Sequence, residues 1–277
     1  MWLVLLGILS VQLGAAFAKD LFSVVSPTGM VWLRMATAAV VVGLIARPVF
    51  RGRSRADWYV AITFGVTLGV MNWSFYQSMS RIPLGIAVTI EFIGPLALAV
   101  VLSRRARDLV WVTLAAVGIL LLGLQPGEVT LAGVLFALLA GAMWAAYILL
   151  SARTGTRWPG LDGLAVASIV AALLLAPFAV VGSSSELLDP RVLALGAVVG
   201  LLSSVIPYSV EMVALRTIRP SVFSILMSME PAAAALTAML VLGEFLTGWQ
   251  WLAVACVVVA SVGATRSGRV ITDPVPD

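Results

Sequence analysis

Histidine is absent from this chain of 277 residues, which also has a single cysteine and a single lysine. The missing imidazole excludes histidine-based zinc sites, Ser-His dyads and histidine proton relays. Cys256 lies in an apolar segment, where a lone cysteine is most often a packing residue, so neither disulfides nor thiol chemistry are indicated. We therefore predict no metal site and no cofactor.

Charged residues are scarce as well. They make up 11% of the chain, beside 61% apolar residues, whereas soluble domains have about 25% charged residues. Each of several uncharged windows is close to the ~20 residues of a membrane-spanning helix. These windows are 58–80, 109–127, 129–152, 163–185, 192–210 and 245–265. The spacing predicts an all-α integral membrane protein in a lipid bilayer. The net charge of +4 comes from loop arginines without a basic face interleaved with aromatics, so no nucleic-acid partner is expected.

We predict ten transmembrane helices, at residues 2–18, 27–46, 57–79, 83–103, 109–125, 130–150, 161–182, 191–214, 220–243 and 248–266. With this division, basic residues gather in alternate loops. Thirteen of them fall on one side: Arg47, Arg51, Arg53, Arg55, Arg104, Arg105, Arg107, Arg153, Arg157, Arg216, Arg219, Arg266 and Arg269. The other side has Lys19, Arg81 and Arg191. Because basic loops tend to stay in the cytoplasm, both termini are predicted to be cytoplasmic.

The first twenty residues, MWLVLLGILSVQLGAAFAKD, allow two interpretations. The AFA segment resembles a signal-peptide cleavage site, but the positively charged start of such peptides is missing. Cleavage would also leave nine helices and put the N-terminus outside, so we favour a retained first helix. The last residues, 267–277, are predicted to form a short cytoplasmic tail.

The two halves of the sequence show a weak internal repeat. WSFYQSMSR (73–81) aligns with YSVEMVALR (208–216), Pro95 then falls on Pro231 after one insertion, and Gly65 falls on Gly200. We predict two five-helix repeats, 1–125 and 126–266. Because five is odd, the second repeat must be inverted, which is the build of many secondary transporters. The glycines alone also fit close helix packing.

Ionisable residues within predicted helices are costly, at about 2.5–3.5 kcal/mol or more at the bilayer centre. Four occur here: Arg34, Glu91, Glu211 and Glu230. Glu91 and Glu230 lie near the middle of their helices, whereas Glu211 is close enough to a helix end to snorkel. Two interpretations of Glu91 stay open: a binding or coupling role, or a buried structural pair with Arg34.

The same helices contain helix breakers, at Gly94, Pro95, Pro207 and Pro231. Pro95 donates no N–H, so the carbonyl of Glu91, four residues earlier, loses its helical partner. A break of this kind is tolerated in lipid only where it faces a water-filled cavity or another helix. Pro231 likewise frees the carbonyl of Met227. A glutamate and a proline in equivalent helices of both halves indicate a binding site between the halves.

Further polar and aromatic candidates lie on neighbouring helices. Asn72 and Tyr76 are four residues apart and share a helix face. The other candidates are Trp73, Trp144, Tyr147 and Tyr208. Each of these side chains either lines a substrate cavity or simply packs against, or hydrogen-bonds to, a neighbouring helix.

One block of the sequence is specific enough to compare with a known family. RIPLGIAVTIEFIGPLALAVVLSRRARD (81–108) resembles the signature of EamA-type carriers of the drug/metabolite transporter superfamily, in particular the threonine/homoserine exporter branch. Other matching pieces follow in the family's order: VQLGAAFAKDLF (11–22), WAAYILLSARTG (144–155), VIPYSVEMVALRTIRPSVFSILMSMEPAAAAL (205–236) and LGEFLT (242–247). One departure is that Glu244 has no counterpart in the first repeat, which reads LSRRARD there.

The resemblance implies ten helices in two inverted repeats, and proton-linked export of amino acids or other small metabolites across a bacterial inner membrane. In this hypothesis Glu91 binds the substrate ammonium, and Arg34 or the start of a broken half-helix meets its carboxylate. Proton uptake on Glu91 would then expel the ammonium. A passive facilitator or a multidrug-type efflux carrier is the alternative. A membrane enzyme is disfavoured, because the aspartates sit at helix ends or loops. Substrate identity, coupling ion and oligomeric state stay open.

Overall fold

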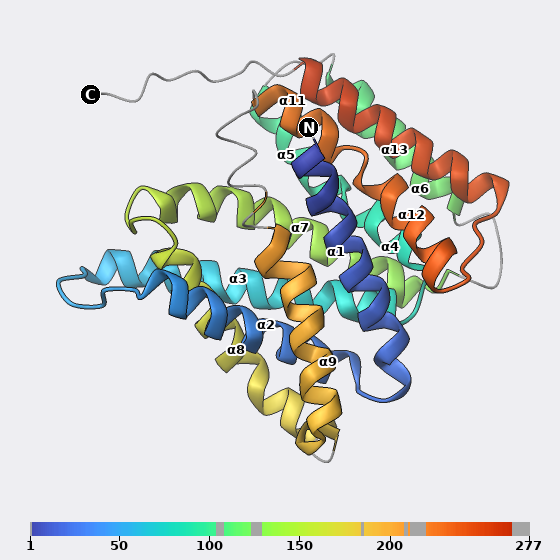
Figure 1. Cartoon of the computed structure of the whole chain (residues 1–277). Helices are drawn as coiled ribbons and strands as arrows, with labels where there is room; N and C mark the ends of the chain where they lie inside the picture. The colour runs from blue at the N-terminus through green and yellow to red at the C-terminus, as the bar shows by residue number, and fades with distance from the viewer. Residues whose placement is uncertain are drawn as a thin grey trace.

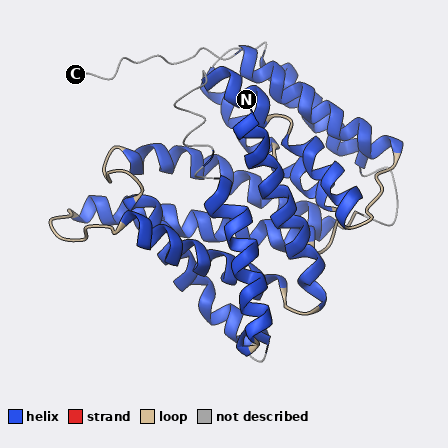
Figure 2. Ribbon diagram, viewed as in Figure 1, coloured by secondary structure: helices blue, strands red, loops and turns tan. Residues whose placement is uncertain are grey.

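The computed structural model describes residues 2–103, 108–122, 129–183, 186–207, 210 and 220–267 (Figure 1). Within these ranges the chain is helical and contains no strand (Figure 2), which confirms the all-α class. The α-helices are α1 (Trp2–Asp20), α2 (Pro27–Ala46), α3 (Arg55–Met79), α4 (Leu84–Glu91), α5 (Ile93–Ser103), α6 (Leu109–Leu122), α7 (Leu131–Gly155), α8 (Asp162–Ser183), α9 (Pro190–Gly200), α11 (Pro220–Met227), α12 (Glu230–Val241) and α13 (Gly248–Ser267). Shorter elements are the 3-10 turns η1 (Leu21–Ser23) and η3 (Glu186–Leu188) and the π-helix η4 (Leu201–Val205).

Six helical segments in the described part of the chain are long and apolar enough to cross a membrane. They are Trp2–Ser23, Pro27–Ala46, Leu84–Leu102, Leu131–Gly155, Asp162–Gly182 and Gly248–Arg266, with shorter apolar helices at Leu109–Gly118, Pro190–Val205 and Ile225–Val241. Large apolar side chains such as Leu44, Phe178 and Leu240 are exposed on the outside, while Ser74 and Thr89 are fully buried. This distribution suits a lipid surround.

Local capping signals explain several helix starts. Ser26 accepts a 3.1 Å hydrogen bond from the backbone N–H of Gly29, and Pro27 occupies the first turn of α2. At α3, Ser54 and Asp57 form a capping box. Such caps satisfy backbone N–H groups that have no partner within the helix, and both starts lie within two residues of those predicted.

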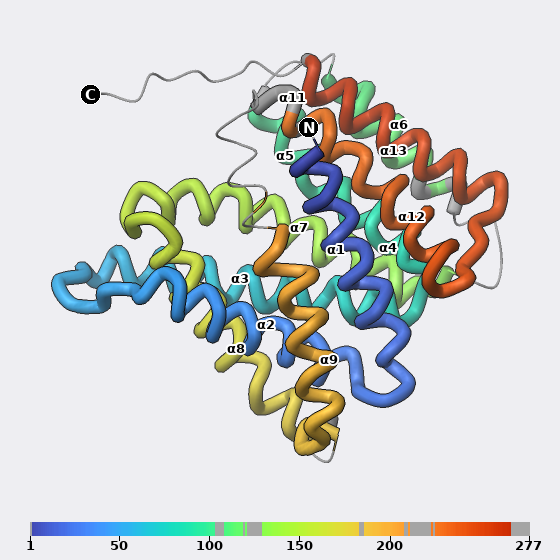
Figure 3. Tube along the Cα trace, viewed as in Figure 1, coloured from blue at the N-terminus to red at the C-terminus, as the bar shows by residue number. Residues whose placement is uncertain are grey.

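The helices form two groups joined by two central helices (Figures 1 and 3). In one group, α2 and α3 pack against α8, and α2 also contacts α9. In the other group, α4 packs against α12 and α6 against α13. The two central helices contact both groups, since α1 touches α9 and α12 while α7 touches α3 and α5. Helices from the two halves of the sequence are therefore interleaved.

At one end of the molecule, the loop between α2 and α3 meets the loop between α7 and α8. Arg157 Nη1 lies 3.0 Å from Asp57 Oδ1. Arg53 Nη2 lies 3.5 Å from Asp162 Oδ2, and the Arg53 guanidinium stacks 4.4 Å over the ring of Trp158. The charge asymmetry placed these two loops on the same side of the membrane, and the structure brings them into contact.

At the other end, Glu244 from the second half binds two segments of the first half. Its Oε1 lies 2.5 Å from Lys19 Nζ, and Lys19 also donates to the carbonyl of Ile82 at 2.8 Å. Its Oε2 accepts a 2.8 Å hydrogen bond from the N–H of Leu84. Pro83 precedes α4 and offers no side-chain cap, so Glu244 caps this helix from the other half. A carboxylate at a helix N-terminus is stabilised there.

Two helical runs are interrupted, one in each half of the chain. α4 ends at Glu91 and α5 begins at Ile93, while α11 ends at Met227 and α12 begins at Glu230. At the first break Gly94 crosses α7 at Gly141, where a Cβ on Gly94 would collide with the Gly141 carbonyl group. Gly94 is thus required for the close approach of two helices, in addition to its place beside Pro95.

We expect Gly94→Ala to destabilise the folded protein strongly, because the added methyl group meets backbone atoms, which cannot rotate away. Overpacking commonly lowers the free energy of unfolding by about 1–3 kcal/mol, occasionally more. Because this clash is with backbone atoms, we expect a loss of about 3 kcal/mol or more. Thermal unfolding of detergent-purified protein would measure this loss. Gly43→Ala in α2 is the matched control, since nothing lies within 4 Å of its added Cβ. Equal melting temperatures for the two variants would show that Gly94 is not required for the close approach of the two helices.

Candidate functional site

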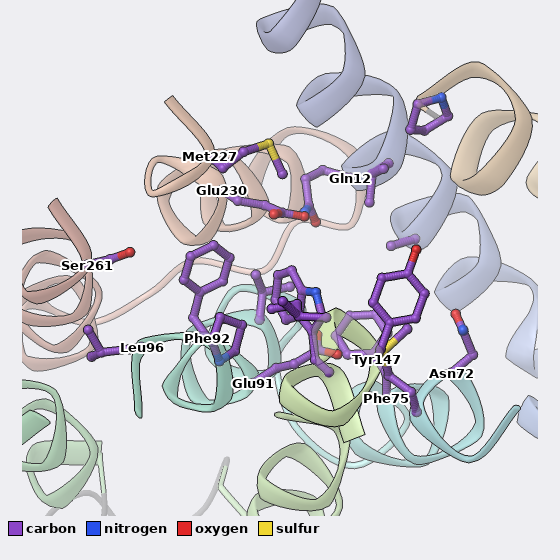
Figure 4. Close-up of a pocket in the computed structure, with 18 of the residues that line it drawn as sticks. Gln12, Asn72, Phe75, Glu91, Phe92, Leu96, Tyr147, Met227, Glu230 and Ser261 are labelled. Carbon is purple, nitrogen blue, oxygen red and sulfur yellow. The ribbon is translucent and has the colours of Figure 1, made fainter. Parts of the chain in front are cut away.

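A cavity of about 430 Å³ lies where the two helix breaks meet the central helices α1 and α7. We call it the polar cavity (Figure 4). The predicted site residues that line it are Arg34, Asn72, Glu91, Trp144, Tyr147 and Glu230, together with Pro95 and Pro207 from the predicted helix breaks. Residues far apart in the sequence, from both halves, therefore share one chamber.

Glu91 occupies the wall formed by the first break. It is the last residue of α4, its side chain is partly exposed, and it makes no hydrogen bond or ion pair with a described residue. The C-terminal end of a helix repels negative charge, so this position favours a bound cation or proton. The Glu91 carbonyl, freed by Pro95, points to α7: it lies 2.5 Å from where a Gly141 Cβ would be. Of the two surroundings expected for this break, a water-filled cavity or another helix, the carbonyl has the second.

Glu230 occupies the opposite wall, at the start of α12. Figure 4 shows its carboxylate beside the amide of Gln12, across the cavity from Glu91. Gln12 Nε2 donates a 3.1 Å hydrogen bond to Glu230 Oε1, and both side chains are buried. The sequence analysis missed Gln12, although a lone amide within an apolar first helix was a usable signal.

Arg34 binds the π-helix η4 of the second half. Its Nη2 donates to the Ser203 carbonyl at 2.9 Å and its Nε to Ser204 Oγ at 3.2 Å. Backbone bonds in the π-helix η4 span five residues, so the carbonyl that Pro207 leaves without an N–H partner is that of Leu202, and it accepts a 2.7 Å hydrogen bond from Ser10 Oγ. The guanidinium also lies 5.8 Å from the centre of the Tyr76 ring. Among the described residues, no ion pair joins Arg34 to Glu91.

Three other predicted residues also line the polar cavity. Asn72 donates to the Leu68 carbonyl of its own helix at 2.9 Å. Trp144 packs edge-on against Phe92, with ring centres 5.1 Å apart. Tyr147 lies beside Phe64, also at 5.1 Å. The cavity wall therefore contains aromatic rings as well as polar side chains.

Not every predicted residue reaches the cavity. Tyr76 is fully buried beneath Arg34. Trp73 donates to Thr28 Oγ1 at 3.2 Å and packs edge-on against Phe136, so helix packing is its role here. Tyr208 and Glu211 lie outside the described residues.

A buried chamber with carboxylates, placed between broken helices of a polytopic membrane protein, is typical of small-molecule transporters. Residues 131–266 match the EamA-like transporter family. The threonine/homoserine exporter RhtA of Salmonella typhimurium strain LT2 is 41% identical over 275 residues, which are 97% of this chain and 93% of that protein. RhtA of Escherichia coli K12 is 41% identical over 96% of this chain and 91% of its own length. The chain belongs to the EamA family of transporters and is not an enzyme.

Two further comparisons extend this assignment. The uncharacterized transporter YwfM of Bacillus subtilis 168 is 33% identical over 56% of this chain and 54% of its own length. A solved crystal structure that is 19% identical superposes with a TM-score of 0.66 over 98% of this chain and 99% of that chain. At this identity the likeness shows the fold alone.

We expect Arg34→Lys to lower stability, because one ammonium cannot reach both η4 acceptors with the forked geometry of a guanidinium. Loss of one hydrogen bond from a charged group lowers the free energy of unfolding by about 1.5–3 kcal/mol. Thermal unfolding in detergent measures the effect, with Arg55→Lys at the exposed start of α3 as the matched control. An unchanged melting temperature for Arg34→Lys would show that the two hydrogen bonds are dispensable.

Proposed function

We propose that this protein exports amino acids of the threonine and homoserine class across the bacterial inner membrane in exchange for protons. The observation that supports this most directly is Glu91, a carboxylate on the wall of the polar cavity that has no hydrogen-bond partner among the described residues. The two RhtA relatives, named as threonine/homoserine exporters, support the substrate class.

The charges of the polar cavity suit a zwitterion. The substrate ammonium binds Glu91 at the end of α4, where the helix end also favours a cation. The substrate carboxylate binds toward Arg34, which lines the same cavity and supplies the positive charge. Asn72 and Tyr147 also line the cavity, and their polar atoms are available to the rest of the substrate.

Exchange follows from competition at one carboxylate. A proton and an ammonium cannot both neutralise Glu91, so proton binding releases the substrate. If protons enter from the outside and the substrate enters from the cytoplasm, each cycle moves the amino acid out. The proton gradient then drives export.

We further propose ten spanning helices in two inverted repeats, 1–125 and 126–266, with both termini and the tail 267–277 in the cytoplasm. Helix pairings support the repeat, because they come in matched sets under this division. The contact of α3 with α7 corresponds to that of η4 with α1, and α5 with α7 corresponds to α12 with α1. Likewise Gly65 of α3 packs against α8, while Gly200 of α9 packs against α2.

Glu91→Gln keeps the shape of the side chain and removes its charge. We expect at least a tenfold loss of threonine counterflow in proteoliposomes, because a close charge pair between ligand and protein contributes more than about 1.4 kcal/mol. Glu186→Gln, a change of the same type in η3 outside the cavity, should leave counterflow unchanged. Undiminished counterflow by inserted Glu91→Gln protein would remove Glu91 from the mechanism.

A pH gradient separates the proposed exchanger from a passive facilitator. In everted vesicles the lumen corresponds to the outside, so an acidic lumen should drive labelled threonine into it above the external concentration. The ionophore-treated vesicle is the control and should only equilibrate threonine. Equilibration alone in both preparations would favour the facilitator.

A further inference from the structure

We propose that the polar cavity also binds amino acids with a second ammonium group, which it holds between Glu230 and Gln12. This inference rests on the proposed function, because it takes Glu91 as the partner of the α-ammonium. It adds a substrate class, the diamino acids, and gives Glu230 a role distinct from that of Glu91.

Charge balance is the first argument. Among the described residues that line the cavity, the charged side chains are Glu91, Glu230 and Arg34. When ionised, these three side chains carry one net negative charge, and a zwitterionic amino acid leaves that sum unchanged. A neutral amino acid can balance this charge with an accompanying proton. A diamino acid balances it with its own second ammonium.

The acceptors beside Glu230 are the second argument. Gln12 uses its Nε2 to donate to Glu230 Oε1, and its Oε1 accepts no hydrogen bond from a described residue, although Gln12 is 1% exposed. A buried amide oxygen without a donor is uncommon in native proteins. An ammonium has three N–H donors, so it can serve Gln12 Oε1 and the Glu230 carboxylate together.

The placement of the two carboxylates is the third argument. Glu91 and Glu230 lie on opposite walls, from opposite halves of the chain (Figure 4). Phe75, Phe92 and Trp144 line the space with aromatic surface, against which methylene groups pack favourably. The volume of about 430 Å³ is within the roughly 300–1,000 Å³ usual for small-molecule sites. A linear side chain with an ammonium at its end therefore has both room and a charged terminus to reach.

Ornithine and norvaline test the proposal, because they differ only in the terminal ammonium. We would measure their equilibrium binding to purified full-length protein by calorimetry, with threonine alongside. Wild type should bind ornithine at least about tenfold tighter than norvaline, as expected of a desolvated charge pair. Glu230→Gln should weaken ornithine at least tenfold while norvaline and threonine change less than about threefold.

A second variant separates the amide from the carboxylate. Gln12→Leu has a similar shape and should also weaken ornithine selectively, by a smaller factor, since it removes one neutral acceptor and keeps the charge. Glu186→Gln is the control for a lost carboxylate outside the cavity and should bind all three ligands as wild type does.

The outcomes are distinct from those of the proposed function. Equal wild-type affinities for ornithine and norvaline would overturn the inference. So would equal losses for all ligands in Glu230→Gln, which would indicate a structural role, or a loss for threonine alone, which would indicate a hydroxyl partner. Selective ornithine binding without threonine export would instead leave this site standing and refute the proposed threonine export.

Discussion

A proline within a membrane helix removes an N–H donor, and the carbonyl four residues earlier must then find another partner or face water. The described part of the chain solves this in two ways. At Pro95 the Glu91 carbonyl packs against Gly141, where the absence of a side chain lets two helices touch. At Pro207, which follows a π-helix, the carbonyl without a partner is that of Leu202, five residues earlier, and it accepts a hydrogen bond from Ser10 Oγ of α1. Both solutions use a helix from the other half of the chain, so the breaks hold the halves together around the polar cavity.

Sequence reasoning was effective where a local signal exists. Uncharged windows indicated membrane helices, and the cost of charge in lipid singled out Glu91, Glu230 and Arg34. The structure brings these three side chains to one cavity. Their transport roles stay proposals, because position in a cavity does not by itself define chemistry.

Other parts of the site depend on contacts that no local pattern encodes. Gln12 pairs with a residue 218 positions later, and Gly141 matters only because Gly94 crosses it. Glu244 lacked a counterpart in the first repeat, yet its partners are Lys19 and the start of α4. Trp73 was deep enough in its helix to be a cavity residue, but the side of the helix it faces is set by packing.

The short helix α4 links the two ends of this arrangement. Over 8 residues it connects Leu84, capped by Glu244 of the second half, to Glu91 at the cavity. An α-helix of 8 residues spans about 12 Å along its axis. Its first end is held by the Glu244 carboxylate, which also pairs with Lys19, and its second end carries the Glu91 carboxylate. α4 therefore joins a contact between the two halves to the carboxylate that we propose as the exchange site.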